Sequence, residues 1–175
     1  MILMKAIKPT KLKDPTFSAQ MRNALKRVGT VIMKEDYGAI TKSWSEENKP
    51  KLKVHTHVTQ SEPSPYIDIE ASGEVWNYVN RGTKPHLIWA GIYTGRSKKR
   101  VLAFPSMFAP KTKVGWVGSG AGKRGGSTVL RPYVSHPGSK ARNFDRAIEK
   151  KRGKWFKRYM EAAMRQSAKS SGHGA

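Results

Sequence analysis

The chain has 175 residues, no cysteine and a net charge of +22, from 34 Lys plus Arg against 12 Asp plus Glu. This length suits a single domain with its own core, and the lack of cysteine excludes disulfide bridges and thiolate metal sites, as is typical of a reducing compartment. The charge favours phosphate backbones or acidic surfaces as partners. Apolar runs are short, so the sequence predicts neither a signal peptide nor a membrane span.

The N-terminal part predicts a basic arm followed by a long helix. Residues 1–13 contain four lysines and a proline, and we expect an arm that reaches a neighbour or stays mobile. Asp14-Pro15 has the pattern of an N-cap and a first helical residue. Apolar residues then recur at steps of three and four (Phe17, Met21, Leu25, Val28 and Ile32). This spacing predicts a helix over 15–36, which Gly38 stops or kinks, and a polar, turn-rich stretch up to Pro50.

A β-hairpin is predicted next, because the apolar period changes to two. Residues 51–58 alternate, residues 66–71 repeat the alternation, and Ser-Glu-Pro-Ser-Pro between them supplies a turn. Cross-strand neighbours project to the same face. That rule allows Val58 to pair with Ile67 and Thr56 with Ile69, which places His57 opposite Asp68 and His55 opposite Glu70.

The central part predicts short elements. Residues 74–79 could form a helical turn or a strand, and we favour the helix. Residues 86–90 and 100–104 have the composition of strands separated by a basic turn, and further short strands are expected around 115–117 and 127–134. Residues 118–127 contain five glycines, which predicts a flexible cationic loop.

The C-terminal part predicts a second helix after Pro137-Gly138. One stripe carries Phe144, Ile148, Lys151, Trp155, Tyr159 and Ala163, widened by Phe156, Met160 and Met164. Residues 169–175 are expected to be disordered. The order of elements predicts the α+β class, an antiparallel sheet of four to six strands packed with a long N-terminal helix and a C-terminal helix, in one domain over 14–168.

The glycine-rich segment resembles a phosphate-binding loop but fails its spacing. That loop needs G-x-x-x-x-G-K-[ST], whereas Val117 stands in place of the first glycine and Arg124 follows Lys123. We interpret the segment as a loop that contacts phosphates without specificity or lines a pore. Gly118-Ser119-Gly120 has the wrong spacing for a nucleophile elbow, and no paired carboxylates stand out. We therefore predict no enzymatic activity and no cofactor.

Histidines allow a metal site, but a solvated strand face is the simpler interpretation. His55, His57, Asp68 and Glu70 share one face of the predicted hairpin, and these side chains suit zinc or iron. Salt-bridge pairs on an exposed face explain them equally well, so we predict no metal. His86 and His136 each adjoin a proline at a chain reversal. Structural roles there, such as a ring nitrogen bonded to a backbone carbonyl, are favoured over catalysis.

The C-terminal helix combines cations with aromatic residues. Residues 139–169 carry eleven Lys or Arg against three acidic residues, with Trp155, Phe156 and Tyr159 between them. This pattern is compatible with a nucleic-acid-binding helix. The aromatic positions are also those that a core-facing helix needs, so we favour a core role for the aromatics and a solvated or subunit-facing role for the charges.

Two segments together resemble a known family. They are Tyr78-Val79-Asn80-Arg81-Gly82-Thr83-Lys84-Pro85-His86 and His136-Pro137-Gly138-Ser139-Lys140-Ala141-Arg142-Asn143-Phe144. Tail-completion proteins of long-tailed bacteriophages, also described as minor tail or head-to-tail connector components, have similar segments in the same order. The resemblance spans roughly residues 15–165. The chain departs from the family pattern at Ser139, where threonine is usual, and at Asn143, where proline often precedes the phenylalanine.

The resemblance implies a virion protein assembled in the host cytoplasm. It implies a subunit of a ring, a hexamer by preference, between the head-closure neck proteins and the tail. Structural roles are expected for the motif residues Tyr78, Gly82, Pro85, His86, His136, Pro137, Gly138, Arg142 and Phe144. Gly82 and Gly138 suit turns with positive φ, Phe144 suits a core anchor, and Arg142 suits bonds to carbonyls or to a neighbour. DNA passes through such a ring, so Lys111, Lys113, Lys123 and Arg124 are candidates for contact with DNA in the lumen or with acidic neighbouring subunits. A free nucleic-acid-binding protein is the alternative.

Overall fold

The computed structural model describes residues 2–5, 15–58, 65–91 and 98–171. Its elements are β1 (Ile2–Lys5), α1 (Pro15–Val31), η1 (Ile32–Tyr37), α2 (Gly38–Thr41), η2 (Glu46–Asn48), β2 (Lys51–His57), β3 (Tyr66–Ser72), α3 (Glu74–Arg81), β4 (His86–Trp89), β5 (Leu102–Ala109), β6 (Lys123–Arg131), β7 (Tyr133–His136) and α4 (Phe144–Ser170). The predicted α+β class with antiparallel strands is confirmed. The strands, however, form three sheets, ordered β1-β3-β2, β4-β7 and β5-β6, instead of one.

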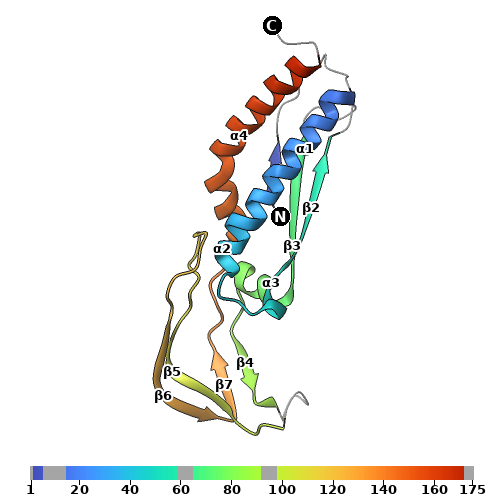
Figure 1. Cartoon of the computed structure of the whole chain (residues 1–175). Coiled ribbons are helices and arrows are strands. Elements are labelled where there is room, and N and C mark those ends of the chain that lie inside the picture. The colour runs from blue at the N-terminus through green and yellow to red at the C-terminus, as the bar shows by residue number, and fades with distance from the viewer. Residues whose placement is uncertain (1, 6–14, 59–64, 92–97, 172–175) are drawn as a thin grey trace.

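The molecule is elongated, with the helices and the two-stranded sheets at different ends (Figure 1). Helices α1 and α4 lie side by side and run in opposite directions, next to the three-stranded sheet. The β4-β7 and β5-β6 sheets, which we call the two ribbons, form the other end. Helix α3 and the start of α4 lie between these halves.

The first helix is longer than its sequence pattern predicts. From Val31 the chain continues through the π-helical segment η1 into α2, and Gly38 has helical angles (φ −58°, ψ −42°). The expected stop at Gly38 is therefore wrong. The stripe of Phe17, Met21, Leu25, Val28 and Ile32 is fully buried, as predicted. Gly29 brings α1 close to the sheet, since a Cβ built there would lie 2.7 Å from Val54 Cγ1. Asp14, the expected N-cap, lies outside the described residues.

The hairpin of β2 and β3 forms with the predicted faces but a different register. Ile69 pairs with Val54 and Ile67 with Thr56, so His55 lies opposite Asp68, Lys53 opposite Glu70 and His57 opposite Tyr66. The predicted pairs are wrong by two residues. A shift of two keeps the same side chains on the same face, and the alternating pattern cannot distinguish the two registers. Oppositely charged residues still face each other across the strands, but the pairs are now His55 with Asp68 and Lys53 with Glu70.

Several predicted boundaries need correction. Ile2–Lys5, expected in an arm, form β1 and pair with β3, because Met4 completes the apolar face over Ile67. Residues 6–13 of that arm are outside the described ranges. Residues 115–117 are not a strand, and the strand expected at 127–134 is divided at Pro132 between β6 and β7. Since β6 begins at Lys123, only 118–122 of the glycine-rich segment is loop. Helix α4 extends to Ser170 into the predicted tail, of which 172–175 are not described.

The main hydrophobic cluster lies in the helical half. It contains residues of β1, α1 through α2, the hairpin, α3 and α4, including the largest side chains, Trp76, Tyr37 and Phe17. Phe156 and Met160 of α4 belong to it, with Trp155 and Tyr159 packed against it, as the core interpretation of that helix predicts. No residue of this cluster comes from β4, β5, β6 or β7. The ribbons therefore lack a share in the main core.

Candidate interaction site

The two segments that carry the family resemblance meet in space at the joint between the two halves. Thr83 and Ser139 form an isolated antiparallel bridge, with N···O distances of 3.0 and 3.1 Å in the two directions. The backbone amide of Ser139 also donates to Thr83 Oγ1 at 3.0 Å. We call this pair and its flanking residues, 78–86 and 136–144, the junction.

Both junction glycines are required by their geometry. Gly82 and Gly138 have φ of +77° and +84°, in the region that disfavours other residues. A Cβ on Gly82 would overlap the carbonyl oxygen of Ser139, and a Cβ on Gly138 would overlap that of Thr83. The predicted positive φ is confirmed at both positions, and the close backbone approach is a second reason for glycine.

The two junction histidines have structural hydrogen bonds. His86 and His136 are register partners at the start of the β4-β7 ribbon, with ring centroids 5.1 Å apart. His86 Nδ1 lies 2.8 Å from the Lys84 carbonyl oxygen, which fits the predicted bond to a carbonyl. His136 differs, because its Nδ1 accepts from the backbone N–H of Gly138 at 3.0 Å. The adjoining Pro85 and Pro137 are exposed at the surface.

Phe144 anchors the junction in the core, as predicted. Its side chain is fully buried and its ring centroid lies 5.2 Å from that of Trp76. The buried Asn80 fixes the start of α4, since its Oδ1 accepts from the Phe144 amide at 2.7 Å and its Nδ2 donates to Asp145 Oδ2 at 2.9 Å. Tyr37 donates to the other carboxylate oxygen of Asp145 at 3.5 Å. Burial, followed by the charge of Asp145, raises the pKa of Tyr37 well above its ordinary value.

Tyr78 and Arg142, the remaining motif residues, occupy different surroundings. Tyr78 is half-exposed on α3 and donates to Glu74 Oε1 at 2.8 Å. Arg142 joins the junction through its backbone, accepting from Gly115 N–H at 2.8 Å and donating to the Val79 carbonyl oxygen at 3.2 Å. Its guanidinium Nε is buried and has no hydrogen-bond partner. The predicted bond from its side chain to a carbonyl is thus not present at Nε.

Four cations were predicted to contact DNA or a neighbouring subunit. They lie in or beside the loop at the turn end of the β5-β6 ribbon. Lys111 and Lys113 are exposed in the connecting loop, while Lys123 and Arg124 are exposed residues of β6 opposite Ala109 and Phe108. The loop folds back toward the helical half (Figure 1). There Ser119 Oγ lies 3.3 Å from Ser43 Oγ. The ribbon, the loop and α3 thereby enclose a groove.

Exposed apolar side chains are concentrated on the ribbons. Leu87 is 51% exposed, Leu130 60%, Phe108 72% and Tyr133 50%. Leu87 and Tyr133 lie on one face of the β4-β7 ribbon, since their register partners are Ser135 and Trp89. A two-stranded ribbon is marginally stable in water on its own, and clustered apolar exposure is typical of interaction sites.

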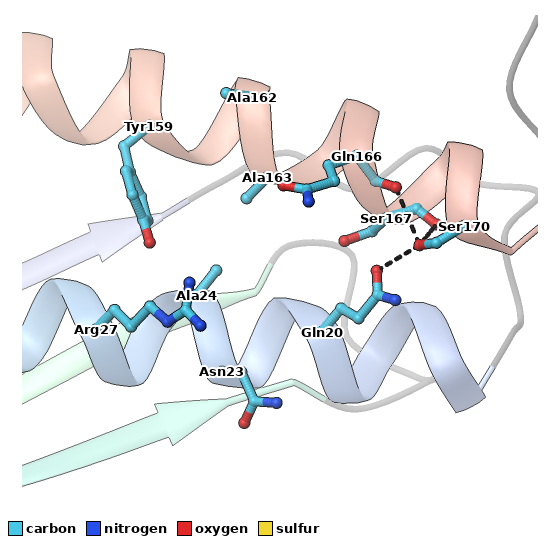
Figure 2. Close-up of a pocket in the computed structure, with 10 residues that line it drawn as sticks. All are labelled: Gln20, Asn23, Ala24, Arg27, Tyr159, Ala162, Ala163, Gln166, Ser167 and Ser170. Atoms are coloured by element: carbon cyan, nitrogen blue, oxygen red, sulfur yellow. Dashed lines mark hydrogen bonds between the residues drawn. The ribbon is translucent and has the colours of Figure 1, made fainter.

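A further hollow lies between α1 and α4 (Figure 2). Its volume is about 440 Å³, and its lining residues are Gln20, Asn23, Ala24, Arg27, Tyr159, Ala162, Ala163, Gln166, Ser167 and Ser170. Small side chains dominate α4 here, Tyr159 extends from α4 toward α1, and Ser170 donates to Gln20 Oε1 at 2.9 Å. One charged side chain, Arg27, lines it. We assign this hollow to the packing of the two helices.

An ion-pair cluster links η1 to α4 and was missed from the sequence. Asp36 is fully buried and accepts from Lys151 Nζ at 2.7 Å and from Arg152 Nε and Nη2 at 2.6 and 3.0 Å. Arg152 also binds Glu35 at 2.6 Å. The hydrogen bond to Asp36 raises the pKa of Arg152. The signal was available, because Asp36 falls four residues after Ile32 on the buried stripe of the first helix.

Within the described ranges, no three His, Asp or Glu residues are placed to hold a metal ion, and no helix combines the length and apolar composition needed to cross a membrane. The chain matches no protein-family model, and neither curated protein sequences nor solved structures give a significant match.

Proposed function

We propose that this chain is a structural virion protein, a subunit of the ring that completes the tail of a tailed bacteriophage and joins it to the head. The proposal begins from the resemblance of residues 78–86 and 136–144 to tail-completion proteins. These segments, far apart in the sequence, interlock at the junction and set the direction of the ribbons. Tyr78, Gly82, His86, His136, Gly138 and Phe144 then have structural roles, as a virion component requires.

One observation carries the oligomeric part of the proposal: the ribbons contribute nothing to the core cluster yet expose large apolar side chains. Such surfaces gain stability when a neighbour covers them, at roughly 25 cal/mol per Å² of apolar area buried. In a ring, each subunit's ribbons would pack on the next subunit. A hexamer, adjacent neck and tail proteins as partners, and location in the virion follow from the resemblance.

Charge sets the conditions for assembly. Each copy carries +22, so copies repel one another at low ionic strength. Salt shortens the range of this repulsion, to roughly 10 Å at 0.1 M. We therefore expect ring formation to increase with salt, unlike assembly held by ion pairs.

Electron microscopy of the purified protein, with sedimentation velocity, tests the ring. We expect closed rings for the unmodified chain and dissociation to monomers for Leu87→Glu. Leu3→Glu is the matched control, because Leu3 is an exposed leucine (37%) in the three-stranded sheet, away from the ribbons. A chain that stays monomeric at every soluble concentration and salt would contradict the proposal. Equal disruption by both substitutions would show that the ribbons are not the interface.

The surface of α4 supports a second candidate, a free nucleic-acid-binding protein. Its exposed face carries Lys150, Lys154, Lys157, Arg158 and Arg165. Binding of this kind weakens steeply with salt, by a slope of roughly 0.9 per phosphate neutralised. Tight, steeply salt-dependent DNA binding by a monomer would favour this candidate over the ring.

A further inference from the structure

A groove separates the turn end of the β5-β6 ribbon from α3. It consists of two hollows of about 570 and 480 Å³, which share Val79, Phe108, Pro110 and Thr112 as lining residues. The larger one extends toward Trp44 and Val75, and the smaller one toward the junction at Gly138. We call these two hollows the ribbon groove. Their volumes lie within the range of about 300–1,000 Å³ that is usual for ligand sites.

The charged residues that line the ribbon groove are all cationic. Lys111, Lys123 and Arg124 line the larger hollow, and Lys140 and Arg142 the smaller, while neither lining contains an Asp or Glu. The buried Nε of Arg142 has no hydrogen-bond partner. A guanidinium is a rigid fork that matches a carboxylate with two parallel hydrogen bonds. The groove is therefore suited to a ligand with negative charge.

An apolar wall lies between these cations. Phe108 lines both hollows and is 72% exposed, and across from it lie Val75 and Val79 of α3. Covering this exposed phenylalanine ring with a ligand is favourable, because apolar surface is removed from water. The ring has no group that can hydrogen-bond or ion-pair with a phosphate. The ligand should thus bring apolar groups as well as negative charge.

We propose that the ribbon groove binds an acidic segment of another protein. An apolar side chain of that segment packs against Phe108 and α3, and its carboxylates pair with Arg142 and the surrounding cations. Phe108 alone could stack on a nucleobase, but the wall facing it is aliphatic, Val75 and Val79, which favours the apolar side chains of a polypeptide over nucleic acid. The net charge of +22 disfavours a second copy of this chain, which would bring like charge to a cationic surface. This inference goes beyond the ring, because the groove is formed within one chain.

Fluorescence anisotropy with the full-length protein tests the groove. The probe is a labelled ten-residue peptide in which Asp and Glu alternate with Leu and Phe, and the reference is the same peptide with Asn and Gln in place of the acids. We expect the acidic peptide to bind and the neutral one to bind at least ~10-fold more weakly, a difference of about 1.4 kcal/mol.

Two matched pairs of substitutions separate the groove from the overall positive field. Arg124→Glu with Lys140→Glu reverses two groove charges, whereas Lys154→Glu with Lys157→Glu reverses two exposed charges on α4. We expect the groove pair to weaken binding by ~10-fold or more and the α4 pair by less than ~3-fold. Phe108→Ser should weaken it about fivefold, since an apolar anchor is lost. All these side chains are exposed, so circular dichroism should show unchanged folding.

Four outcomes would overturn the proposal. Equal weakening by the two pairs would show attraction by net charge alone, and unchanged binding by Phe108→Ser would remove the apolar anchor. A short DNA, single-stranded or duplex, that loses affinity with the groove pair but not with the α4 pair would assign the groove to nucleic acid. Loss of self-association by the groove pair in sedimentation would assign it to a second copy. The first three results do not depend on whether rings form.

Discussion

The buried carboxylate of Asp36 gives a sharp test of how the helical half is held together. It accepts three hydrogen bonds from Lys151 and Arg152. Its side chain is 0% exposed, against 12% for Arg152 and 49% for Lys151. The substitution Asp36→Asn keeps the shape of the side chain but removes the charge, so the nearly buried guanidinium of Arg152 keeps only the exposed Glu35 as a counter-ion.

The cost follows from burial. Removing one partner of a buried pair costs about 3–5 kcal/mol, because the other charge is left uncompensated. Lys151 is half-exposed and can turn to water, so we expect a loss near the lower end, about 3 kcal/mol. That is a large share of a typical stability of roughly 5–15 kcal/mol. Glu35→Gln is the control, because Glu35 is 60% exposed and its pair with Arg152 should contribute less than about 1 kcal/mol.

Urea unfolding followed by circular dichroism measures both free energies. The double substitution Asp36→Leu with Arg152→Met removes both charges and should recover most of the stability, since apolar residues of similar size replace buried pairs at little cost. Equal, small losses for Asp36→Asn and Glu35→Gln would refute the argument from burial. So would a double variant as unstable as Asp36→Asn.

Three other substitutions, two of them with controls, test the junction and the contact of Tyr37 with Asp145 beside it. Gly138→Ala should destabilise by at least ~2 kcal/mol through its positive φ and the clash with Thr83, whereas Gly153→Ala, in open space on α4, should stabilise by about 0.5–1 kcal/mol; urea unfolding compares the two. Asn80→Ala should cost about 2–3 kcal/mol by removing the acceptor of the buried Phe144 amide and one donor to Asp145, with Asn77→Ala on the exposed side of α3 as control. The raised pKa of Tyr37 means that the folded chain keeps a proton that the unfolded chain loses, so stability falls above about pH 10 and Tyr37→Phe should flatten that fall.

The sequence predicts the helices well because the apolar pattern that buries them is formed by residues three or four positions apart. The stripe from Phe17 to Ile32 repeats at helical spacing, and burial follows it residue by residue. The same stripe continues to Asp36, where an acid at an apolar position indicates a buried pair, although its partners Lys151 and Arg152 lie over a hundred residues away. A local pattern can show that a buried acid needs a counter-ion, but it cannot show which distant residue supplies that counter-ion.

In the ribbon half, strands were predicted near 86–90, 100–104 and 127–134, but their pairing into two separate sheets was not, because it joins segments that are distant in the sequence. β4 pairs with β7 across more than forty residues, so neither strand's neighbour in the sequence is its neighbour in the sheet. Lys123 and Arg124 have glycine on both sides, which suggests a loop, but pairing with Ala109 and Phe108 holds them in a strand. The positive φ of Gly82 and Gly138 was predictable from chain reversals. The groove was not, since it depends on how the ribbon folds back on α3.

The junction explains how one chain combines a well-packed half with an open one. Asn80 and Phe144 attach it to the core, while the Thr83–Ser139 bridge and the paired His86 and His136 begin the β4-β7 ribbon. Because the glycines admit no side chain there, the two backbone segments lie in direct contact and fix the direction of the ribbon relative to the core. If the exposed apolar groups of the ribbon bind the proposed neighbour, such a fixed base lowers the conformational entropy lost on binding. The close backbone contacts of Gly82 and Gly138 therefore lie next to a ribbon with exposed apolar side chains.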